Sequence, residues 1–347
     1  MRVYTHQHKH YCGIDLHARS MYVCLLDQAG TSLVHKNVAA TPEAFLRVVA
    51  PYRDDVVVAV ECVFSWYWLA DLCAQAGIAF VLGHALYMKA IPGGKAKNDK
   101  IDAHKIAVLL RGGMLPMAYV YPPEMRATRD LLRRRCHLRR KRAELLAHIQ
   151  NTNSQYNLPE IGKKLAYKAN RQGVAEHFPE PSVRTTVELD LTLIEHYDKL
   201  LSEVELYITR TAKGHDVQTF SRLQSVPGIG QILALVILYE IQDSARFPRV
   251  QDFVAYCRLG KCAKESAGKR QGLSGKKIGN PQLKWAFSEA AVLFLRQNKL
   301  GQQYFAKLEH KHGKGKALTV LAHKLARAVS YMLTRQHAVD LHRFVTA

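Results

Sequence analysis

The sequence predicts an α/β domain, then a pair of long helices, then a helical C-terminal region. Three features of the chain carry this prediction. Residues 11–120 alternate short apolar runs with helix-like segments, residues 124–208 hold two long segments with apolar residues three or four apart, and residues 221–347 have a helical pattern with one interruption rich in glycine and lysine. We therefore divide the 347 residues into an α/β domain over 1–120, a coiled-coil region over 121–215 and a helical domain over 216–347.

The α/β domain is expected to begin with three strands in a meander. Residues 11–16 and 21–26 are apolar runs on either side of a polar stretch, as in a β-hairpin, and residues 32–38 continue as a third strand. Further strands are expected over 56–60, a valine-rich run typical of a strand buried on both faces, and over 78–82. Helices are expected over residues 42–49, 66–76 and 99–110, with Thr41 and Asn98 as N-caps of the first and the last. This order of strands and helices is that of an RNase H-like domain.

The coiled-coil region contains two seams of apolar residues. In the first, Leu131, Leu138 and Leu145 recur every seven residues, and the other helix faces carry a cluster of arginines that includes Arg133, Arg134, Arg135, Arg139 and Arg140. The second seam runs from Val187 to Ile208 with spacings of three and four residues. The two segments are expected to pair as an antiparallel coiled coil or to dimerise between subunits, although two ordinary helices on a globular core fit the pattern equally well. Residues 151–186, between the seams, are expected to form a loop or hinge.

The helical domain contains two segments suited to phosphate binding. The sequence Val-Pro-Gly-Ile-Gly at 226–230 resembles the hairpin of helix-hairpin-helix modules, in which glycines such as Gly228 and Gly230 let backbone N–H groups approach a phosphate. Residues 261–284 hold seven Lys or Arg and one Glu. In this glycine- and lysine-rich loop a serine among cations could attack a phosphate, or the loop could bind phosphate passively. From spacing alone, passive binding is the stronger interpretation.

The overall charge of the chain indicates a polyanionic partner. There are 50 Lys and Arg against 29 Asp and Glu, a formal net charge of +21, and nucleic acid is the usual polyanion for such a protein. No apolar run is long enough to span a bilayer, and the histidine-containing N-terminus does not resemble a secretory signal. We therefore expect a cytoplasmic protein without a membrane partner.

Cysteine and histidine usage gives little support for a structural metal. The seven cysteines are scattered with no CxxC pair, which excludes zinc ribbons and thioredoxin-type motifs and indicates reduced core residues. The cluster of His6, His8, His10 and Cys12 could bind a metal, but a frayed terminus is the stronger interpretation. The Gly-Gly-Lys run at 93–95 lacks the spacing of a nucleotide-binding P-loop.

Four acidic residues of the α/β domain occupy positions suited to metal binding. Asp15 and Glu61 each end a predicted buried strand, while Asp99 and Asp102 are three residues apart at the start of a predicted helix and share one face. Carboxylates brought together repel one another unless a cation neutralises them, and their hard oxygen atoms suit Mg²⁺. Each acid alone has a plainer role, such as complementing the helix dipole. As a set they predict a Mg²⁺ site.

Several motifs of the chain together resemble one family. They are YCGID at residues 11–15, AVE at 59–61, KNDKIDAHKIA at 97–107, VPGIG at 226–230, the segment 247–256, and the stretch from Ser266 to GNPQL at 279–283. In order and content they are similar to the motifs of the DEDD-type insertion-sequence transposases and the related Piv-type DNA invertases, and they cover most of the chain.

The resemblance implies a RuvC-like N-terminal domain, a coiled-coil linker and a helical C-terminal transposase domain. It places the family's metal-binding acids at Asp15, Glu61, Asp99 and Asp102, with Mg²⁺ as the cofactor. Its serine nucleophile falls on Ser266, with Ser274 as the alternative; the family usually has glycine after this serine, where this chain has Ala267.

The resemblance also implies the reaction and its partners. Family members resemble serine recombinases that exchange DNA strands through a covalent phosphoserine. A structured guide RNA from the element pairs with donor and target double-stranded DNA, and a homodimer assembles to a tetramer. The location implied is the bacterial cytoplasm, with association to the nucleoid during the reaction.

The residues expected to contact nucleic acid come from the arginine cluster, the Val-Pro-Gly-Ile-Gly segment and the glycine- and lysine-rich loop. They are Arg133, Arg134, Arg135, Arg139, Arg140, Gly228, Gly230, Lys269, Arg270, Lys276, Lys277 and Asn280. Two other functions stay open on this sequence. An RNase H-like nuclease, such as a junction resolvase, would hydrolyse DNA with Mg²⁺-bound water and need no serine, and a non-catalytic binding protein would only hold phosphates.

Overall fold

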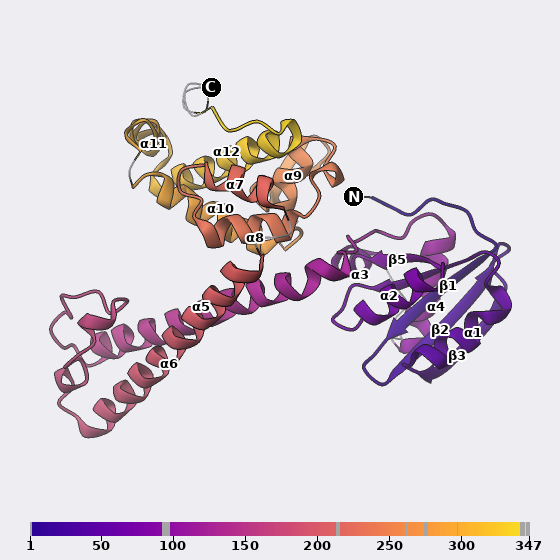
Figure 1. The fold of residues 1–347 in the computed structure, drawn as a ribbon, viewed down its shortest axis with the longest axis horizontal. Coiled ribbons are helices and arrows are strands. Elements are labelled where there is room, and N and C mark those ends of the chain that lie inside the picture. The colour runs from indigo at the N-terminus through magenta and orange to yellow at the C-terminus, as the bar shows by residue number, and fades with distance from the viewer. Residues whose placement is uncertain are drawn as a thin grey trace. The chain divides into compact units, whose positions relative to one another are not determined.

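The computed structural model of the protein describes residues 2–91, 98–212, 216–260, 263–273, 277–296, 298–340 and 344. The chain divides into two compact units, Met1–Pro123 and Glu124–Ala347 (Figure 1). The first unit corresponds to the α/β domain expected over residues 1–120. The two long helices, expected as a region of their own, cluster with the C-terminal helices in the second unit.

The first unit is built on a five-stranded sheet of order β3-β2-β1-β4-β5. β1 (His10–Leu16), β2 (Ser20–Asp27) and β3 (Ser32–Ala39) form an antiparallel meander, and β4 (Val56–Glu61) and β5 (Ala79–Gly83) add strands parallel to β1. The predicted meander and the two later strands are confirmed. Because β1 and β4 are parallel neighbours, their carboxyl ends meet at the same end of the sheet.

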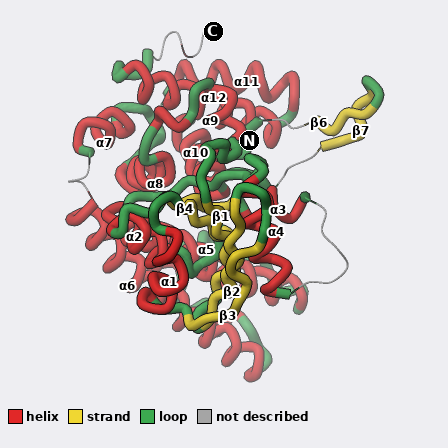
Figure 2. The backbone as a smooth tube through the Cα atoms, turned by 90° about the vertical axis from the view of Figure 1, so that its right-hand side faces the viewer, coloured by secondary structure: helices red, strands yellow, loops and turns green. Residues whose placement is uncertain are grey.

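Helices cover both faces of this sheet (Figure 2). On one face, α1 (Pro42–Val49) and α2 (Tyr67–Gln75) pack through apolar side chains such as Phe45 and Leu69. On the other face, α3 (Ala85–Ala90) and α4 (Asp99–Arg111) contribute Met88 and Ile106 to a second core. A strand covered on both faces needs apolar side chains on both, which explains the valine-rich run of β4. Thr41 and Asn98 cap α1 and α4 as predicted.

Helix α4 lies in direct backbone contact with β1 at Gly13. A Cβ atom on this residue would lie 2.3 Å from the backbone nitrogen of Ala107 and 2.4 Å from the carbonyl oxygen of Ala103. Any larger residue would push the helix away from the sheet, so the close approach itself requires glycine at this position.

The N-terminal histidine cluster is hydrogen-bonded to the sheet domain, so the frayed terminus expected from the sequence is wrong for His8. Its Nδ1 lies 2.6 Å from Asp55 Oδ1, and its Nε2 lies 2.6 Å from the Tyr4 hydroxyl. Cys12 is buried in the sheet core and belongs to no group of metal-ligand atoms among the described residues.

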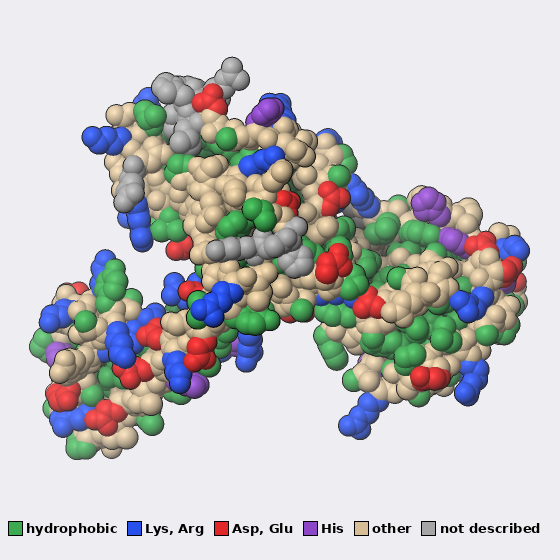
Figure 3. Space-filling view, viewed as in Figure 1, with side chains coloured by type: hydrophobic (Ala, Val, Ile, Leu, Met, Phe, Trp, Pro, Cys, Tyr) green, Lys and Arg blue, Asp and Glu red, His purple; other side chains and the backbone are tan. Residues whose placement is uncertain are grey.

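In the second unit, α5 (Pro123–Gln155) and α6 (Pro181–Thr211) run antiparallel along each other. Two ion pairs link them, Arg135 with Glu205 at 2.5 Å and Arg142 with Asp198 at 2.6 Å, and a hydrogen bond joins His148 to Asp190 at 2.5 Å. From one pair to the next, the residue number on α6 falls as the residue number on α5 rises. This order shows that the two helices of one chain pair in antiparallel orientation. Basic and acidic side chains are interleaved over the visible face of this pair (Figure 3).

The far end of the α5–α6 pair has a small core of its own. Ile149, Val187 and Ile194 from the two helices pack with Leu165 and Phe178 from the connecting segment. That segment covers residues 156–180, including two short 3-10 turns, Lys168–Asn170 and Ala175–His177. It is shorter than the loop predicted over 151–186, because both helices extend further than their apolar seams indicate.

Six helices and a hairpin form the described C-terminal part of the second unit. They are α7 (Val217–Gln224), α8 (Gln231–Ile241), α9 (Val250–Tyr256), β6 (Ala263–Ser266), β7 (Lys269–Leu273), α10 (Pro281–Phe294), α11 (Lys299–His312) and α12 (Lys314–Arg335). α8 is the centre of this core, because every residue from Leu233 to Ile241 is buried. Among the described residues, no helix combines the length and hydropathy needed to cross a membrane.

A buried ion-pair network joins α5 to α8 and α10. Glu240 on α8 is 2% exposed and accepts hydrogen bonds from Arg133 Nε at 2.6 Å, Arg129 Nε at 3.1 Å and Asn280 Nδ2 at 2.7 Å. Burial opposes ionisation of the Glu240 carboxyl, but the hydrogen bonds and charges of these partners outweigh burial, and its pKa is lowered. The carboxylate is therefore ionised in the folded protein and fixes three helices together.

Candidate active site

Asp15 and Glu61 lie at the carboxyl ends of two neighbouring parallel strands, β1 and β4. Gly13 lies opposite Ala59 in the parallel register, so two residues further along, Asp15 and Glu61 follow on adjacent strands. Side chains alternate along a strand, and these four residues therefore share the face of the sheet that α4 covers. Both acids are half-buried, as expected for strand-end residues that border solvent.

The first turn of α4 brings two further acids to the same place. Asn98 starts the helix by accepting a hydrogen bond from the Ile101 backbone N–H at 2.9 Å, and Asp99 and Asp102 follow in the first turn. Because α4 contacts β1 at Gly13, its N-terminal end lies next to Asp15.

His17 links the two acidic segments and was not predicted from the sequence. Its Nε2 lies 3.4 Å from Asp15 Oδ2 and 3.4 Å from Asp99 Oδ2. One ligand atom from each of these three residues lies within 4.8 Å of the others. The signal that could have identified His17 is its position two residues after Asp15, the interval at which strand side chains return to one face.

The electrostatics of this group fit a divalent cation. Burial raises the pKa of the Asp15 carboxyl, and the negative charges of Asp99 and Asp102 raise it further, while His17 lowers it. The acids thus repel one another at short range, and a cation would relieve that repulsion. Carboxylate oxygens are the ligands that Mg²⁺ prefers, so the donor chemistry of Asp15 and Asp99 fits such an ion.

The structure thus brings together three of the four predicted acids. Asp15 and Asp99 meet directly through His17, and Asp102 is close enough for its charge to act on Asp15.

Glu61 lies on the neighbouring strand, at the start of a short loop whose Phe64 is 83% exposed. An aromatic side chain so exposed beside an acidic site was also missed, because an isolated Phe in a loop has no distinctive pattern.

The candidate nucleophile Ser266 lies at the tip of a β-hairpin rather than in an irregular loop. It is the last residue of β6, pairs with Lys269 at the start of β7, and is exposed, as is Lys269. The two turn residues, Ala267 with φ 50° and Gly268 with φ 72°, have the left-handed backbone of a tight type I′ turn. The other candidate, Ser274, and the predicted phosphate ligand Lys276 lie outside the described residues.

Two family models match these two parts of the chain. A model described as a transposase matches residues 12–157, which include the acidic group, and one described as the transposase IS116/IS110/IS902 family matches residues 220–306, which include the hairpin. The chain belongs to the IS110/IS116 family of DEDD transposases.

Curated relatives of the transposase match along nearly its whole length. It is 24% identical over 331 residues to the transposase for insertion sequence element IS1111A of Coxiella burnetii, covering 93% of this chain and 89% of the relative. It is also 24% identical over 335 residues to the transposase for insertion sequence element IS1328 of Yersinia enterocolitica, covering 94% of this chain and 97% of the relative. The protein is thus a DNA-acting enzyme, and its DEDD domain implies use of a divalent metal.

The five arginines predicted to contact nucleic acid divide into two groups in the transposase. Arg133 is ion-paired with Glu240, and Arg135 is buried and paired with Glu205. These two side chains hold α5 against α8 and α6, a role that the sequence pattern did not reveal. The other three are exposed on α5, namely Arg134, Arg139 and Arg140.

The glycine and asparagine candidates also have roles in packing. A Cβ on Gly228 would lie 2.5 Å from the Ala290 carbonyl oxygen of α10, so this glycine serves a close helix contact. Asn280 is 4% exposed and caps α10 through hydrogen bonds from the backbone N–H groups of Gln282 and Leu283. Gly230, at the N-terminus of α8, is exposed with open space where a Cβ would be. Exposed Lys277 follows the hairpin; Arg270 lies within β7.

Proposed function

We propose that this transposase exchanges DNA strands through a covalent phosphoserine at Ser266, with Mg²⁺ bound by Asp15, Glu61, Asp99 and Asp102 and with a structured RNA as guide. The observation that carries the proposal is the position of Ser266, at the exposed tip of a hairpin in the family's C-terminal domain. At a hairpin tip the hydroxyl can enter a DNA groove, which a serine within a packed helix cannot do.

In the proposed step, the Ser266 oxygen attacks a backbone phosphorus. A serine O–P bond forms while one P–O bond of the DNA strand breaks, and the departing deoxyribose oxygen takes up a proton. The charge of Lys269, opposite Ser266 in the hairpin, favours the extra negative charge of the transition state. Divalent ions held by the four carboxylates would supply a Lewis acid for phosphate chemistry. The phosphoserine keeps the energy of the broken bond, so rejoining needs no ATP.

Two separate surfaces of the chain support RNA binding and the formation of an oligomer. Three arginines on α5, Arg134, Arg139 and Arg140, are exposed and suited to phosphate contacts along a helical backbone. On α6, Leu189 is 62% exposed and Leu193 47% exposed, outside the seam that packs on α5. Exposed leucines one helical turn apart favour association of α6 with a second copy of the chain in a dimer and then a tetramer.

The proposal is tested by trapping the covalent intermediate on a nicked suicide substrate. After proteolysis, mass spectrometry should find the nucleotide adduct on the peptide that contains Ser266. Ser266→Ala should lose the adduct and strand exchange but keep nucleic-acid binding, and Ser288→Ala, an exposed serine on α10, is the matched control. An adduct on Ser274 would move the nucleophile by eight residues.

A metal-dependent nuclease without a serine nucleophile is the second candidate. It is favoured by the acidic group at Asp15, His17 and Asp99, which lies within the first unit and involves no residue of the hairpin. This alternative predicts products with hydrolysed ends, full activity in Ser266→Ala and loss of cleavage in Asp15→Asn.

A further inference from the structure

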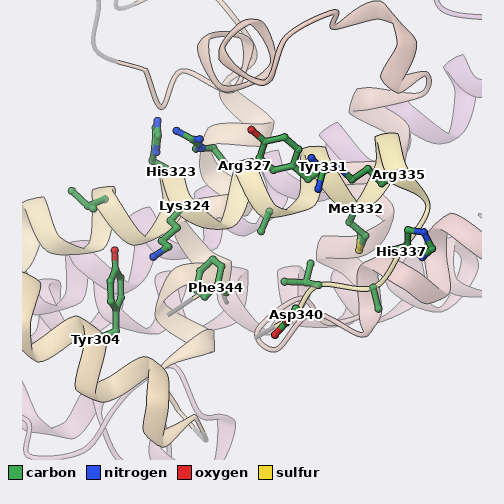
Figure 4. Close-up of a pocket in the computed structure, with 14 residues that line it drawn as sticks. Tyr304, His323, Lys324, Arg327, Tyr331, Met332, Arg335, His337, Asp340 and Phe344 are labelled. Carbon is green, nitrogen blue, oxygen red and sulfur yellow. The ribbon is translucent and has the colours of Figure 1, made fainter. Parts of the chain in front are cut away.

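A cavity beside α12 is lined by aromatic rings and positively charged side chains. In the sequence, most of its lining residues are far from both proposed catalytic segments. Its volume is about 640 Å³, within the range of small-ligand sites, and 14 residues line it (Figure 4). The aromatic lining residues are Tyr304, Tyr331 and Phe344, and those that can carry positive charge are His323, Lys324, Arg327, Arg335 and His337. One described lining residue, Asp340, is acidic.

The cations of this cavity are associated with rings instead of carboxylates. Lys324 Nζ lies 4.3 Å from the centre of the Tyr304 ring and 5.3 Å from that of Phe344, and Arg335 Cζ lies 5.0 Å from that of Tyr331. Within the described ranges, Lys324, Arg327 and Arg335 form no ion pair with a carboxylate. Their positive charge is therefore available to an anion.

One row of α12 presents this chemistry in a regular order. His323, Arg327, Tyr331 and Arg335 recur every four residues and lie along one side of the helix, with Tyr331 between the two arginines (Figure 4). Arg327, Tyr331 and Arg335 are exposed. Burial and the charge of Arg327 lower the pKa of His323 and of Lys324.

We propose that this cavity binds an unpaired nucleotide of a nucleic-acid strand, with its base stacked on the Tyr331–Arg335 pair and its phosphate held by Arg327. A planar base can stack on a tyrosine ring or a guanidinium plane, and arginine binds a phosphate through strong, often bidentate, hydrogen bonds. The proposal rests on the nucleic-acid binding in the proposed function and not on its phosphoserine step. The strand can be single-stranded RNA or a displaced DNA strand, since both offer a base and a phosphate.

The test measures binding of fluorescein-labelled oligouridylate, oligothymidylate and a duplex to the full-length protein by fluorescence anisotropy. Tyr331→Ala should weaken binding of a single strand about tenfold, the size of one lost base stack, while Tyr331→Phe keeps it. Arg327→Gln should lower the slope of log K against log salt by about 0.7, the value for one single-strand phosphate contact. Tyr167→Ala and Arg296→Gln, exposed residues outside the cavity, are the matched controls and should bind like the unaltered protein.

The comparison of strands identifies the source of the nucleotide. A Tyr331→Ala defect with oligouridylate alone assigns the cavity to RNA, and a defect with both oligonucleotides assigns it to single strands in general. An effect no greater than that of Tyr167→Ala, or an equal loss for the duplex, would overturn the proposal. Because the readout is binding, a chain that fails to form the Ser266 adduct can still pass this test.

Discussion

Replacing Gly13 with alanine tests whether the contact between α4 and β1 sets the geometry of the acidic site. The added Cβ would lie 2.3 Å from the Ala107 nitrogen, whereas ordinary contacts of a Cβ begin near 3.4 Å. Both clashing atoms belong to the helix backbone, so no side-chain rotation relieves the clash and α4 must retreat by about 1 Å. Overpacking of this kind costs about 1–3 kcal/mol of folding free energy. Asp99, in the first turn of α4, would move away from Asp15 by a similar distance.

Gly13→Ala is expected to lower the rate of DNA cleavage more than the loss of folding free energy alone would explain. A misplacement of about 1 Å at a catalytic site can lower the rate about 100-fold, so Gly13→Ala should lose strand cleavage at temperatures where it stays folded. The matched control is Gly77→Ala. Gly77 has φ +66° with no neighbour within 4 Å of a built Cβ, so alanine there costs about 1–2 kcal/mol through backbone strain alone.

Urea unfolding and a DNA-cleavage assay on the same preparations compare the two variants. The expected result is similar stability loss in both and loss of cleavage in Gly13→Ala only. Cleavage by Gly13→Ala equal to that of Gly77→Ala would refute the view that this helix–strand contact positions the acids.

Two further predictions concern the arginines of α5 and their buried partner. Glu240→Gln should destabilise the protein by about 3–5 kcal/mol, because it removes the buried carboxylate that pairs with the buried Arg129 and the half-buried Arg133. Since the folded pKa of Glu240 is lowered, its stabilisation is present above its unfolded pKa of about 4.3 and is lost as the pH falls through the folded value. Urea midpoints measured from neutral to acid pH should thus fall less steeply in Glu240→Gln; identical pH profiles would contradict this. The double variant Arg139→Gln/Arg140→Gln should keep the melting temperature and lower the salt dependence of RNA binding. Arg133→Gln, in contrast, should lower the melting temperature. The reverse pattern would contradict the division into exposed arginines that bind RNA and a paired arginine that stabilises the fold.

Much of the fold follows from short-range pattern. The five strands, the caps at Thr41 and Asn98 and the two long helices all depend on neighbours a few residues away, which alternation, capping chemistry and apolar spacing record directly. The hairpin at Ser266 was expected as a loop because its strands consist mainly of polar residues, and such strands have no alternation of apolar residues.

The site was only partly predictable, because long-range side-chain pairing leaves no local pattern. Asp15 and Asp99 were found by their positions at element ends, but the link through His17 depends on how α4 crosses the sheet. In the same way, Arg133 and Arg134 look equivalent in a basic run. Only the fold shows that Arg133 reaches Glu240, 107 residues away, while Arg134 faces solvent.

The most direct test of the proposed phosphoserine mechanism is the identity of the residue bonded to DNA during the reaction. The transposase is incubated with a suicide substrate in Mg²⁺, the products are digested with protease, and the nucleotide-bearing peptide is sequenced by mass spectrometry. We expect a phosphodiester bond to Ser266 that is absent from Ser266→Ala and from Asp15→Asn. Cleaved DNA with free hydrolysed ends and no peptide attached, at equal yield in Ser266→Ala, would contradict it.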